Sequence, residues 1–197
     1  MAELILFNKP YRVLSQFTDR QGRPTLADWI DAPGFYPAGR LDFDSEGLLL
    51  LCDDGALQQR ISNPRHRHWK SYWLQLEGRI SDAAIEALRR GVELRDGPTL
   101  PARVRRIAAP QLWQREPPVV ARHRDGSSWI EIAVCEGRNR QLRRMAAAVG
   151  HPVLRLVRTA IGDWRLADLA PGAWERRRVH LPRAAVRRGQ SGKMPRQ

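Results

Sequence analysis

The sequence has little cysteine, few acidic residues and no long apolar stretch. Its two cysteines, Cys52 and Cys135, give neither a disulfide framework nor the spacing of a zinc site. Each lies in an apolar run, so we expect buried free thiols in a reducing compartment. No apolar run approaches the roughly 20 residues that span a bilayer, and the N-terminus lacks the pattern of a signal peptide. We therefore expect a cytoplasmic protein without a membrane span.

The shortage of acids leaves a large excess of positive charge. The 197 residues contain 34 Lys and Arg against 21 Asp and Glu, a formal net charge of +13 and a pI near 11.2. Such a field attracts polyanions, nucleic acid first and an acidic membrane surface second. Most of the basic residues are arginines, which grip phosphate with a planar fork and stack on bases. The composition therefore favours nucleic acid as the partner.

Apolar runs and turn residues divide the chain into short strands and a few short helices. No internal repeat is present, and the proline-rich middle, residues 96–125, predicts short strands joined by loops. We expect an α+β fold with a mixed, largely antiparallel sheet. Strands are predicted over residues 3–7, 48–52, 71–78, 127–137 and 152–162. Helices are predicted over residues 24–34, 56–62, 82–90 and 140–149, with Thr25, Ser81 and Asn139 as N-caps.

The length fits one globular domain or two small lobes. We expect residues 1–182 to form a single catalytic domain. Residues 183–197 contain five basic residues, no acids, and Gly, Ser and Pro. This composition predicts a disordered tail whose use would be loose contact with phosphates.

The segment YPAGRLDFDSEGLLLLCDDG places Asp42, Asp44 and Glu46 between Arg40 and four leucines. If the leucines form a buried strand, Asp42 lies in the loop that enters it, where reactive groups often sit. One interpretation makes Asp42 a nucleophile or base that Arg40 keeps ionised. The other is structural: Asp42 pairs with Arg40 at the surface, Asp44 lies in a turn and Glu46 is solvated. Charge alone does not separate the two.

The segment CEGRNRQLRRMAAAVG predicts a helix with two different faces. Arg140, Arg143 and Arg144 share one side, where like charges repel unless an anion lies between them. The turn at residues 137–139 adds Arg138 and backbone N–H groups. A phosphate clamp in which one arginine meets a carboxylate is the functional interpretation, and a solvated basic face is the structural one. The opposite side is an apolar stripe of Leu142, Met145, Ala146 and Val149.

The segment HRHWKSYWLQLEG mixes cations with aromatic rings. Two His, Lys70, Tyr72 and two Trp are typical of sites that bind single-stranded RNA or a flipped base. Tyr72 alternates with leucines, which places it on the core face of a strand with its phenol at the rim. His66 and His68 have no acidic neighbour, so we predict no metal site.

Together these segments resemble a known family. GRLDFDSEGLLLLCDDG, KSYWLQLEG and EGRNRQLRRMAAAVGHPVLRLVRTAIG are similar to the three signature blocks of the bacterial RsuA-type ribosomal RNA pseudouridine synthases. LFNKPYRVLSQFTD resembles the first strand of their catalytic domain, and the match covers residues 4 to about 165. It is most similar to a branch that modifies large-subunit RNA. Many members carry an S4-type RNA-binding domain before the Asn-Lys-Pro block, and we expect none here because that block starts at residue 8.

The resemblance implies a fold and a reaction. The fold would be that of a pseudouridine synthase, with two lobes on a mixed sheet and a central active-site cleft. The reaction would convert one uridine of ribosomal RNA, 23S rRNA by branch, to pseudouridine without a cofactor or metal. The bond between N1 and C1′ breaks, the freed uracil turns, and a bond between C5 and C1′ forms. Ribosomal RNA would be the partner of a monomeric enzyme.

The resemblance also implies roles for single residues. Asp42 matches the essential aspartate, acting as a nucleophile on the sugar or as the base of a glycal route, and the sequence leaves both open. Tyr72 would stack on the uracil and take a proton from C5. Arg143 best matches the arginine that pairs with the aspartate, and Arg140 is the competing alignment. RNA contacts are expected from Arg40, which would enter the RNA stack, from Lys70, Arg138, Arg140 and Arg144, and from Leu156 in the base pocket.

Two other functions stay open at this point. A non-catalytic RNA-binding or ribosome-assembly protein of the same fold would need only the net charge. A glycoside hydrolase would pair Asp42 with Asp44 or Glu46, but it would explain neither the arginine-rich helix nor the charge.

Overall fold

The computed structural model describes residues 1–120 and 126–179, so the tail predicted over residues 183–197 lies outside it. Among the described residues, no helix has the length and apolar character needed to cross a membrane. The helices are α1 (Gly55–Ser62), α2 (Asp82–Arg90) and α3 (Gln141–Ala148), with 3-10 turns η1 (Leu26–Asp28) and η2 (Pro64–His66). The strands are β1 (Ala2–Lys9), β2 (Tyr36–Pro37), β3 (Glu46–Cys52), β4 (Lys70–Glu77), β5 (Glu93–Leu94), β6 (Gly97–Pro98), β7 (Arg103–Ile107), β8 (Ser127–Val134), β9 (Val153–Ile161), β10 (Trp164–Arg165) and β11 (Trp174–Val179).

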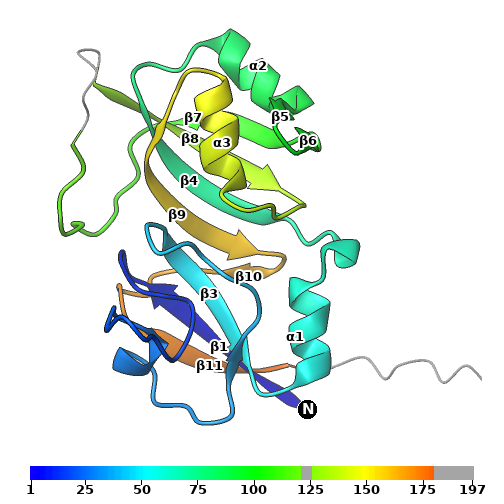
Figure 1. Cartoon of the computed structure of the whole chain (residues 1–197), viewed down its shortest axis with the longest axis vertical. Helices are drawn as coiled ribbons and strands as arrows, with labels where there is room; N and C mark the ends of the chain where they lie inside the picture. Colours follow the sequence, from blue (N-terminus) through cyan, green and yellow to red (C-terminus); the bar gives the residue numbers. More distant parts are fainter. Residues whose placement is uncertain (121–125, 180–197) are drawn as a thin grey trace, which may run out of the picture.

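One sheet runs through the whole molecule in the order β11-β1-β3-β9-β4-β8-β7, with β2 paired to β3 and β10 to β9. Its strands pair antiparallel except β3 and β9, which run parallel over two residue pairs. This short junction separates an upper lobe, which carries α2 and α3, from a lower lobe built on β1, β3 and β11 (Figure 1). The predicted α+β fold with a mixed, largely antiparallel sheet is confirmed.

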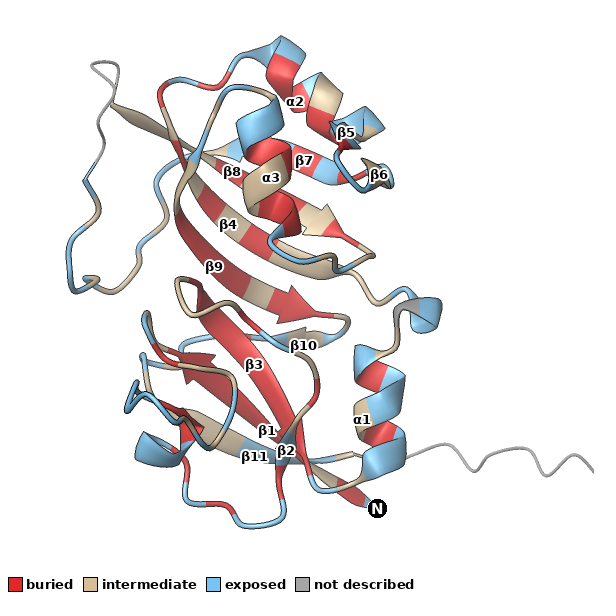
Figure 2. Cartoon of the chain, viewed as in Figure 1, coloured by how far each residue is buried: buried red, intermediate tan, exposed pale blue. Residues whose placement is uncertain are grey.

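Strand β3 is buried along its whole length, which explains its run of leucines (Figure 2). Successive side chains of a strand point to opposite faces. Leu48 and Leu50 accordingly pack into one cluster of the lower lobe, and Leu49 and Leu51 into another. Both faces are covered, which explains the unbroken apolar run from Leu48 to Cys52. A third cluster fills the upper lobe between β4, β8 and the helices α2 and α3.

The helix predicted over residues 24–34 is wrong. Thr25 does act as an N-cap, accepting from the amide of Ala27, but the turn that follows covers only Leu26–Asp28. Ile30, Ala32 and Phe35 all enter the core of the lower lobe. Residues two and five positions apart do not share a helix face, so burial of all three requires an irregular path.

Other differences lie at edges and ends. Strand β11 was not predicted because its sequence, WERRRV, lacks apolar alternation. It is an edge strand on β1, where arginines facing solvent discourage pairing with other chains. Cys52 is buried as expected, but Cys135 follows the end of β8 and is only half-buried, contrary to prediction.

Candidate active site

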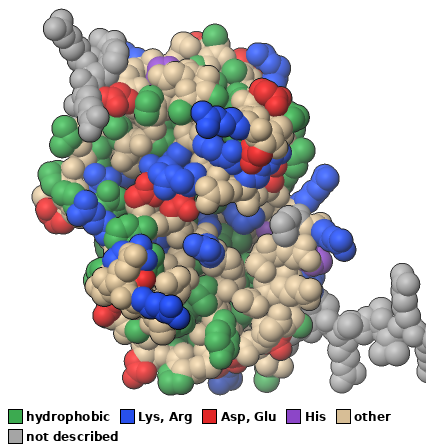
Figure 3. Space-filling model, viewed as in Figure 1, with side chains coloured by type: hydrophobic (Ala, Val, Ile, Leu, Met, Phe, Trp, Pro, Cys, Tyr) green, Lys and Arg blue, Asp and Glu red, His purple; other side chains and the backbone are tan. Residues whose placement is uncertain are grey.

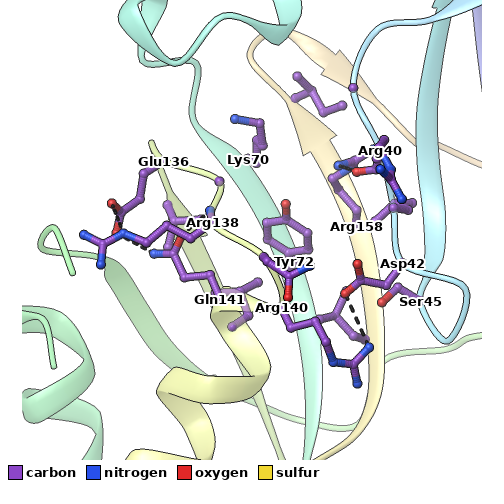
Figure 4. Close-up of a pocket in the computed structure, with 18 of the residues that line it drawn as sticks. Arg40, Asp42, Ser45, Lys70, Tyr72, Glu136, Arg138, Arg140, Gln141 and Arg158 are labelled. Carbon is purple, nitrogen blue, oxygen red and sulfur yellow. Dashed lines mark hydrogen bonds and ion pairs between the residues drawn. The ribbon is translucent and has the colours of Figure 1, made fainter. Parts of the chain in front are cut away.

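A cavity of about 400 Å³ opens between the two lobes. It is lined by the loop ahead of β3, by residues 134–143, by the end of α1 and by β4 and β9. Figure 4 shows the ring of Tyr72 near its centre, with Asp42 on one side and Arg138 on the other. Eight predicted site residues line the cavity, and Arg144 does not. The eight are Asp42, Tyr72, Arg143, Arg40, Lys70, Arg138, Arg140 and Leu156.

The Asp42 carboxylate lies beside Arg140 and not beside Arg40. Its Oδ2 is 3.8 Å from Nη1 of Arg140 (Figure 4), and its side chain is 37% exposed. Arg40 makes no ion pair with any acid in the described part of the chain, so the expected pairing of Arg40 with Asp42 is not found. Arg143 reaches the next acid: its Nη2 donates to the Asp44 carbonyl at 2.6 Å. Arg140, the alternative match for the arginine that pairs with the aspartate, is therefore the described arginine nearest to Asp42.

The loop that carries Asp42 is held from four directions. Ser15 Oγ donates to the Leu41 carbonyl at 2.8 Å and accepts from the Leu41 amide at 3.0 Å. On the other side of Asp42, the amide of Arg12 donates to the Phe43 carbonyl at 2.8 Å. With Arg143 on the Asp44 carbonyl, these contacts fix the backbone on both sides of the carboxylate.

The fourth support is Arg158 of β9, which is 3% exposed. Its Nη1 donates to the Arg40 carbonyl at 3.1 Å, and its Nε donates to the Leu48 carbonyl at 2.7 Å. One guanidinium thus ties the start of the Asp42 loop and the following strand β3 to β9. Sequence reasoning missed this residue, although an arginine inside an apolar strand was a usable signal of a buried charge.

The junction beneath the loop depends on Gly47. Its φ is +101°, and a Cβ there would lie 2.3 Å from the Arg158 carbonyl oxygen. Only glycine, which lacks a Cβ, accepts that backbone conformation at so close an approach. Gly47 is therefore required for β3 and β9 to pair at the point where the Asp42 loop enters the sheet.

Next to this glycine lies a buried ion pair. Glu46 is 1% exposed, so the interpretation that it is solvated is wrong. Its carboxylate accepts from Nε and Nη2 of Arg155, both at 2.9 Å, and from Nε1 of Trp113 at 2.8 Å. These bonds satisfy the carboxylate and connect β3 to β9. Neither Asp44 nor Glu46 lines the cavity, so neither partner considered for a hydrolase faces the site.

Lys9 is a further buried charge that the sequence did not reveal. It has no exposed surface, and its Nζ donates to the carbonyl oxygens of Val13 at 2.7 Å and Pro10 at 2.9 Å. Burial lowers its pKa to about 7, against the attraction of Glu46 and with the repulsion of Arg158. Lys9 holds the start of the N-terminal loop that carries Arg12 and Ser15.

The arginines around α3 are neutralised by the protein's own acids. Arg140 binds both oxygens of Asp44, at 3.1 and 2.9 Å, and Arg144 binds both oxygens of Asp96, at 2.7 and 3.1 Å. Burial would raise the pKa of Asp44, but the hydrogen bond from Arg140 and the charges of both neighbouring arginines hold it below its usual value. Arg138 lies 3.4 Å from Glu136 and 3.6 Å from Asp96. The anions expected between these arginines are thus internal carboxylates.

The start of α3 also differs from expectation. Arg140, and not Asn139, occupies the N-cap position, in a left-handed conformation with φ 48° and without a side-chain cap. Instead, the Gln141 side chain accepts from the amide of Arg138 at 3.0 Å. This turn points the Arg140 guanidinium across the cavity to Asp42 and Asp44. The predicted stripe of Leu142, Met145 and Ala146 is buried as expected, and Val149 packs against it partly buried.

Comparison with known proteins identifies the family. The model of the RNA pseudouridylate synthase family matches residues 3–148. The chain belongs to this family.

Relatives of this pseudouridine synthase support both the resemblance and the fold. It is 59% identical over 171 residues to ribosomal large subunit pseudouridine synthase E of Xanthomonas axonopodis pv. citri, covering 85% of this chain and 90% of that protein. It is 53% identical over 180 residues to the protein of the same name from Vibrio vulnificus, covering 91% and 76%. A crystal structure of a pseudouridylate synthase matches with a TM-score of 0.74 at 30% identity, covering 90% of this chain and 71% of that one. The predicted pseudouridine synthase fold is confirmed.

Within the described part of this synthase, no group of three His, Cys, Asp or Glu side chains is arranged to hold a metal ion. Asp42 and Glu136 are the carboxylates that line the cavity. Glu136 accepts hydrogen bonds from Gln141 and from the Leu100 amide. Asp42 accepts none through its side chain in the described structure, so its oxygens are available to a substrate.

Proposed function

We propose that this pseudouridine synthase converts a uridine of large-subunit, 23S ribosomal RNA to pseudouridine. The name shared by the Xanthomonas and Vibrio relatives supports this substrate, because both align over most of their length. The net charge of +13 suits an RNA of this size. We propose residues 1–182 as the catalytic unit, acting as a monomer in the cytoplasm where ribosomes are assembled.

The observation that carries the mechanism is the carboxylate of Asp42, which accepts no hydrogen bond from the described residues and whose loop is held on both sides. It faces the cavity on a loop fixed at Arg40, Leu41, Phe43 and Asp44, while the other acids near it are paired. Either catalytic route uses the carboxylate as an anion, and the Arg140 guanidinium, 3.8 Å away, can stabilise charge that develops beside it. Asp42 would attack C1′ of the ribose, or start a glycal route as a base, while the bond from C1′ to N1 breaks.

Tyr72 is placed to hold the freed base. Tyr72 is 8% exposed, and Leu156 lies on the neighbouring strand of the same wall. The uracil would stack on the ring, turn, and bond through C5 to C1′; on the nucleophilic route the bond between C1′ and the Asp42 oxygen breaks as this bond forms and frees the carboxylate. The proton lost from C5 would be taken up through the phenol, and N1 would gain one, so the product is an isomer of the substrate.

The target must leave its stack before it can reach Asp42, at a cost of a few kcal/mol. Arg40 suits the role of filling the gap, because it lines the cavity, is exposed, and forms no ion pair with any described acid. Binding energy from the surrounding RNA would offset the remainder.

Pseudouridine mapping across both ribosomal RNAs, from cells with and without the gene, tests this function. We expect one uridine of the large-subunit RNA to remain unmodified without the gene, and to be restored by the wild-type protein. An unchanged map would contradict the proposal and favour the non-catalytic alternative. Light scattering of the purified protein tests whether it is a monomer in solution.

A further inference from the structure

The two rims of the cavity differ in how their positive charge is used. On the α3 rim, Arg138, Arg140, Arg143 and Arg144 all lie within ion-pair distance of Asp44, Asp96 or Glu136. A phosphate arriving there would compete with carboxylates that already hold the guanidinium groups. That rim is therefore organised mainly to position the catalytic loop.

The opposite rim carries charge without such partners. Residues 55–76 contain no acid, and none of their Lys or Arg side chains makes an ion pair with an acid in the described ranges. Arg60, Arg65, His66 and Arg67 are exposed. Figure 3 shows blue and purple side chains together on the right of the waist, where this segment lies. We call this surface the basic rim, defined as Arg60, Arg65, His66, Arg67, His68 and Lys70.

The basic rim is continuous with the cavity and is held in a defined shape. Ile61, Ser62 and Lys70 from the same segment line the cavity. The Asn63 side chain accepts from the amide of Arg65 at 2.9 Å, and a His68 ring nitrogen lies 3.1 Å from the Arg60 carbonyl. These bonds tie the segment to the end of α1 and leave its guanidinium groups pointing to solvent.

An aromatic ring supports the same segment from below. Arg103 of β7 lies over the ring of Trp69, with 4.2 Å from its Cζ to the ring centroid. The amide of Gly162 donates to the Trp69 carbonyl at 2.8 Å, which ties the segment to the end of β9. The segment is thus attached to β7 and to the end of β9, a strand that lines the cavity.

We propose that the basic rim is a phosphate-binding site for the RNA strand that leads the target uridine into the cavity. The inference rests on the proposed function, which places that uridine beside Asp42. Contacts to phosphates fix the register of a nucleic acid without reading its sequence. The rim places Arg60, Arg65, Arg67 and Lys70, none of which pairs with a described acid, on one segment that continues into the cavity lining. Cations along such a path suit the sugar–phosphate backbone of a single strand. The phosphate clamp predicted on α3 is therefore assigned to the α1–β4 connection.

The test uses the full chain and an unmodified, in-vitro-transcribed large-subunit rRNA. Each lost phosphate contact reduces the dependence of log K on log salt by about 0.7 for a single strand. We expect Arg65→Gln with Arg67→Gln to raise Kd about 10-fold in moderate salt and to reduce the slope by about 1.4. The matched control, Arg79→Gln with Arg90→Gln, removes the same charge from two exposed arginines, one just before α2 and one at its end, and should leave the slope as in wild type.

Equal slopes for the rim variant and the wild type would overturn the inference, as would equal losses in both double variants. Binding is measured without turnover, so the inference and the proposed function can fail separately. If wild type forms no pseudouridine in the transcript but the rim variant has a smaller slope of log K against log salt, phosphate binding by the rim is supported and the proposed function is contradicted. If pseudouridine forms and the slopes are equal, the proposed function is supported and phosphate binding by the rim is contradicted.

Discussion

The hydroxyl of Ser15 bonds to both backbone groups of Leu41, the residue directly before Asp42. It donates to the carbonyl at 2.8 Å and accepts from the amide at 3.0 Å. A hydroxyl is a side-chain group that can do both at one atom, because it combines a donor with acceptor lone pairs. Ser15 thereby sets the backbone that aims the Asp42 carboxylate, without lining the cavity itself.

Loss of the Ser15 hydroxyl should reduce kcat by more than the accompanying loss of folding stability can explain. We expect Ser15→Ala to lower kcat about 10-fold with little change in KM, because a displaced carboxylate loses reactive geometry. The free energy of unfolding should fall by about 1 kcal/mol. Ser81→Ala is the matched control, since it removes the N-cap of α2 at a similar cost in stability. If both variants show the same kcat, Ser15 has no positioning role.

Gly47 gives a second test, of the junction between the lobes. An alanine there meets both an unfavourable φ and a backbone oxygen 2.3 Å from its Cβ. Gly97 has nearly the same φ, +96°, but open space around the Cβ position. We expect Gly97→Ala to cost about 1–2 kcal/mol and Gly47→Ala more than about 4 kcal/mol in denaturant unfolding. Similar costs for the two variants would show that the close approach of β3 and β9 is not required.

The sequence predicts best where local pattern and burial agree. The alternation in β4 and β8 and the leucines of β3 follow directly from which faces are covered. The residues that line the cavity could be predicted from the sequence, because most of them fall in three recognisable segments. The pairing of charges could not be predicted. Whether Arg40 or Arg140 reaches Asp42 depends on a left-handed residue at the start of α3. Arg158 was missed, and Glu46 was wrongly expected to be solvated, because their partners lie far away in sequence.

Buried Lys9 should make stability depend on pH. Its pKa is about 7 in the folded protein and near 10.5 when exposed, so between these values the unfolded chain binds more protons. The free energy of unfolding therefore gains up to about 1.4 kcal/mol per pH unit as pH rises above 7. Lys9→Met should reduce the slope measured between pH 7 and 9. Lys70→Met should reduce it less, because Lys70 is only half-buried.

The measurement ends at pH 9 so that titration of Cys52 does not contribute to the slope. Burial of Cys52 raises the pKa of its thiol to about 11. Above pH 9 the unfolded chain loses that proton first, which lowers stability and opposes the effect of Lys9. A slope that is unchanged in Lys9→Met would show that this lysine is not held in a low-pKa environment.

The most direct test of the catalytic assignment is single-turnover pseudouridine formation by Asp42→Asn on the unmodified large-subunit transcript. The substitution keeps the shape of the side chain and removes its charge. We expect thermal unfolding and RNA affinity close to wild type, and a rate at least about 1,000-fold lower. Asp44→Asn, which affects an acid outside the cavity, should retain reduced but measurable turnover. An Asp42→Asn rate within about 10-fold of wild type would contradict the assignment of Asp42 as the reacting carboxylate.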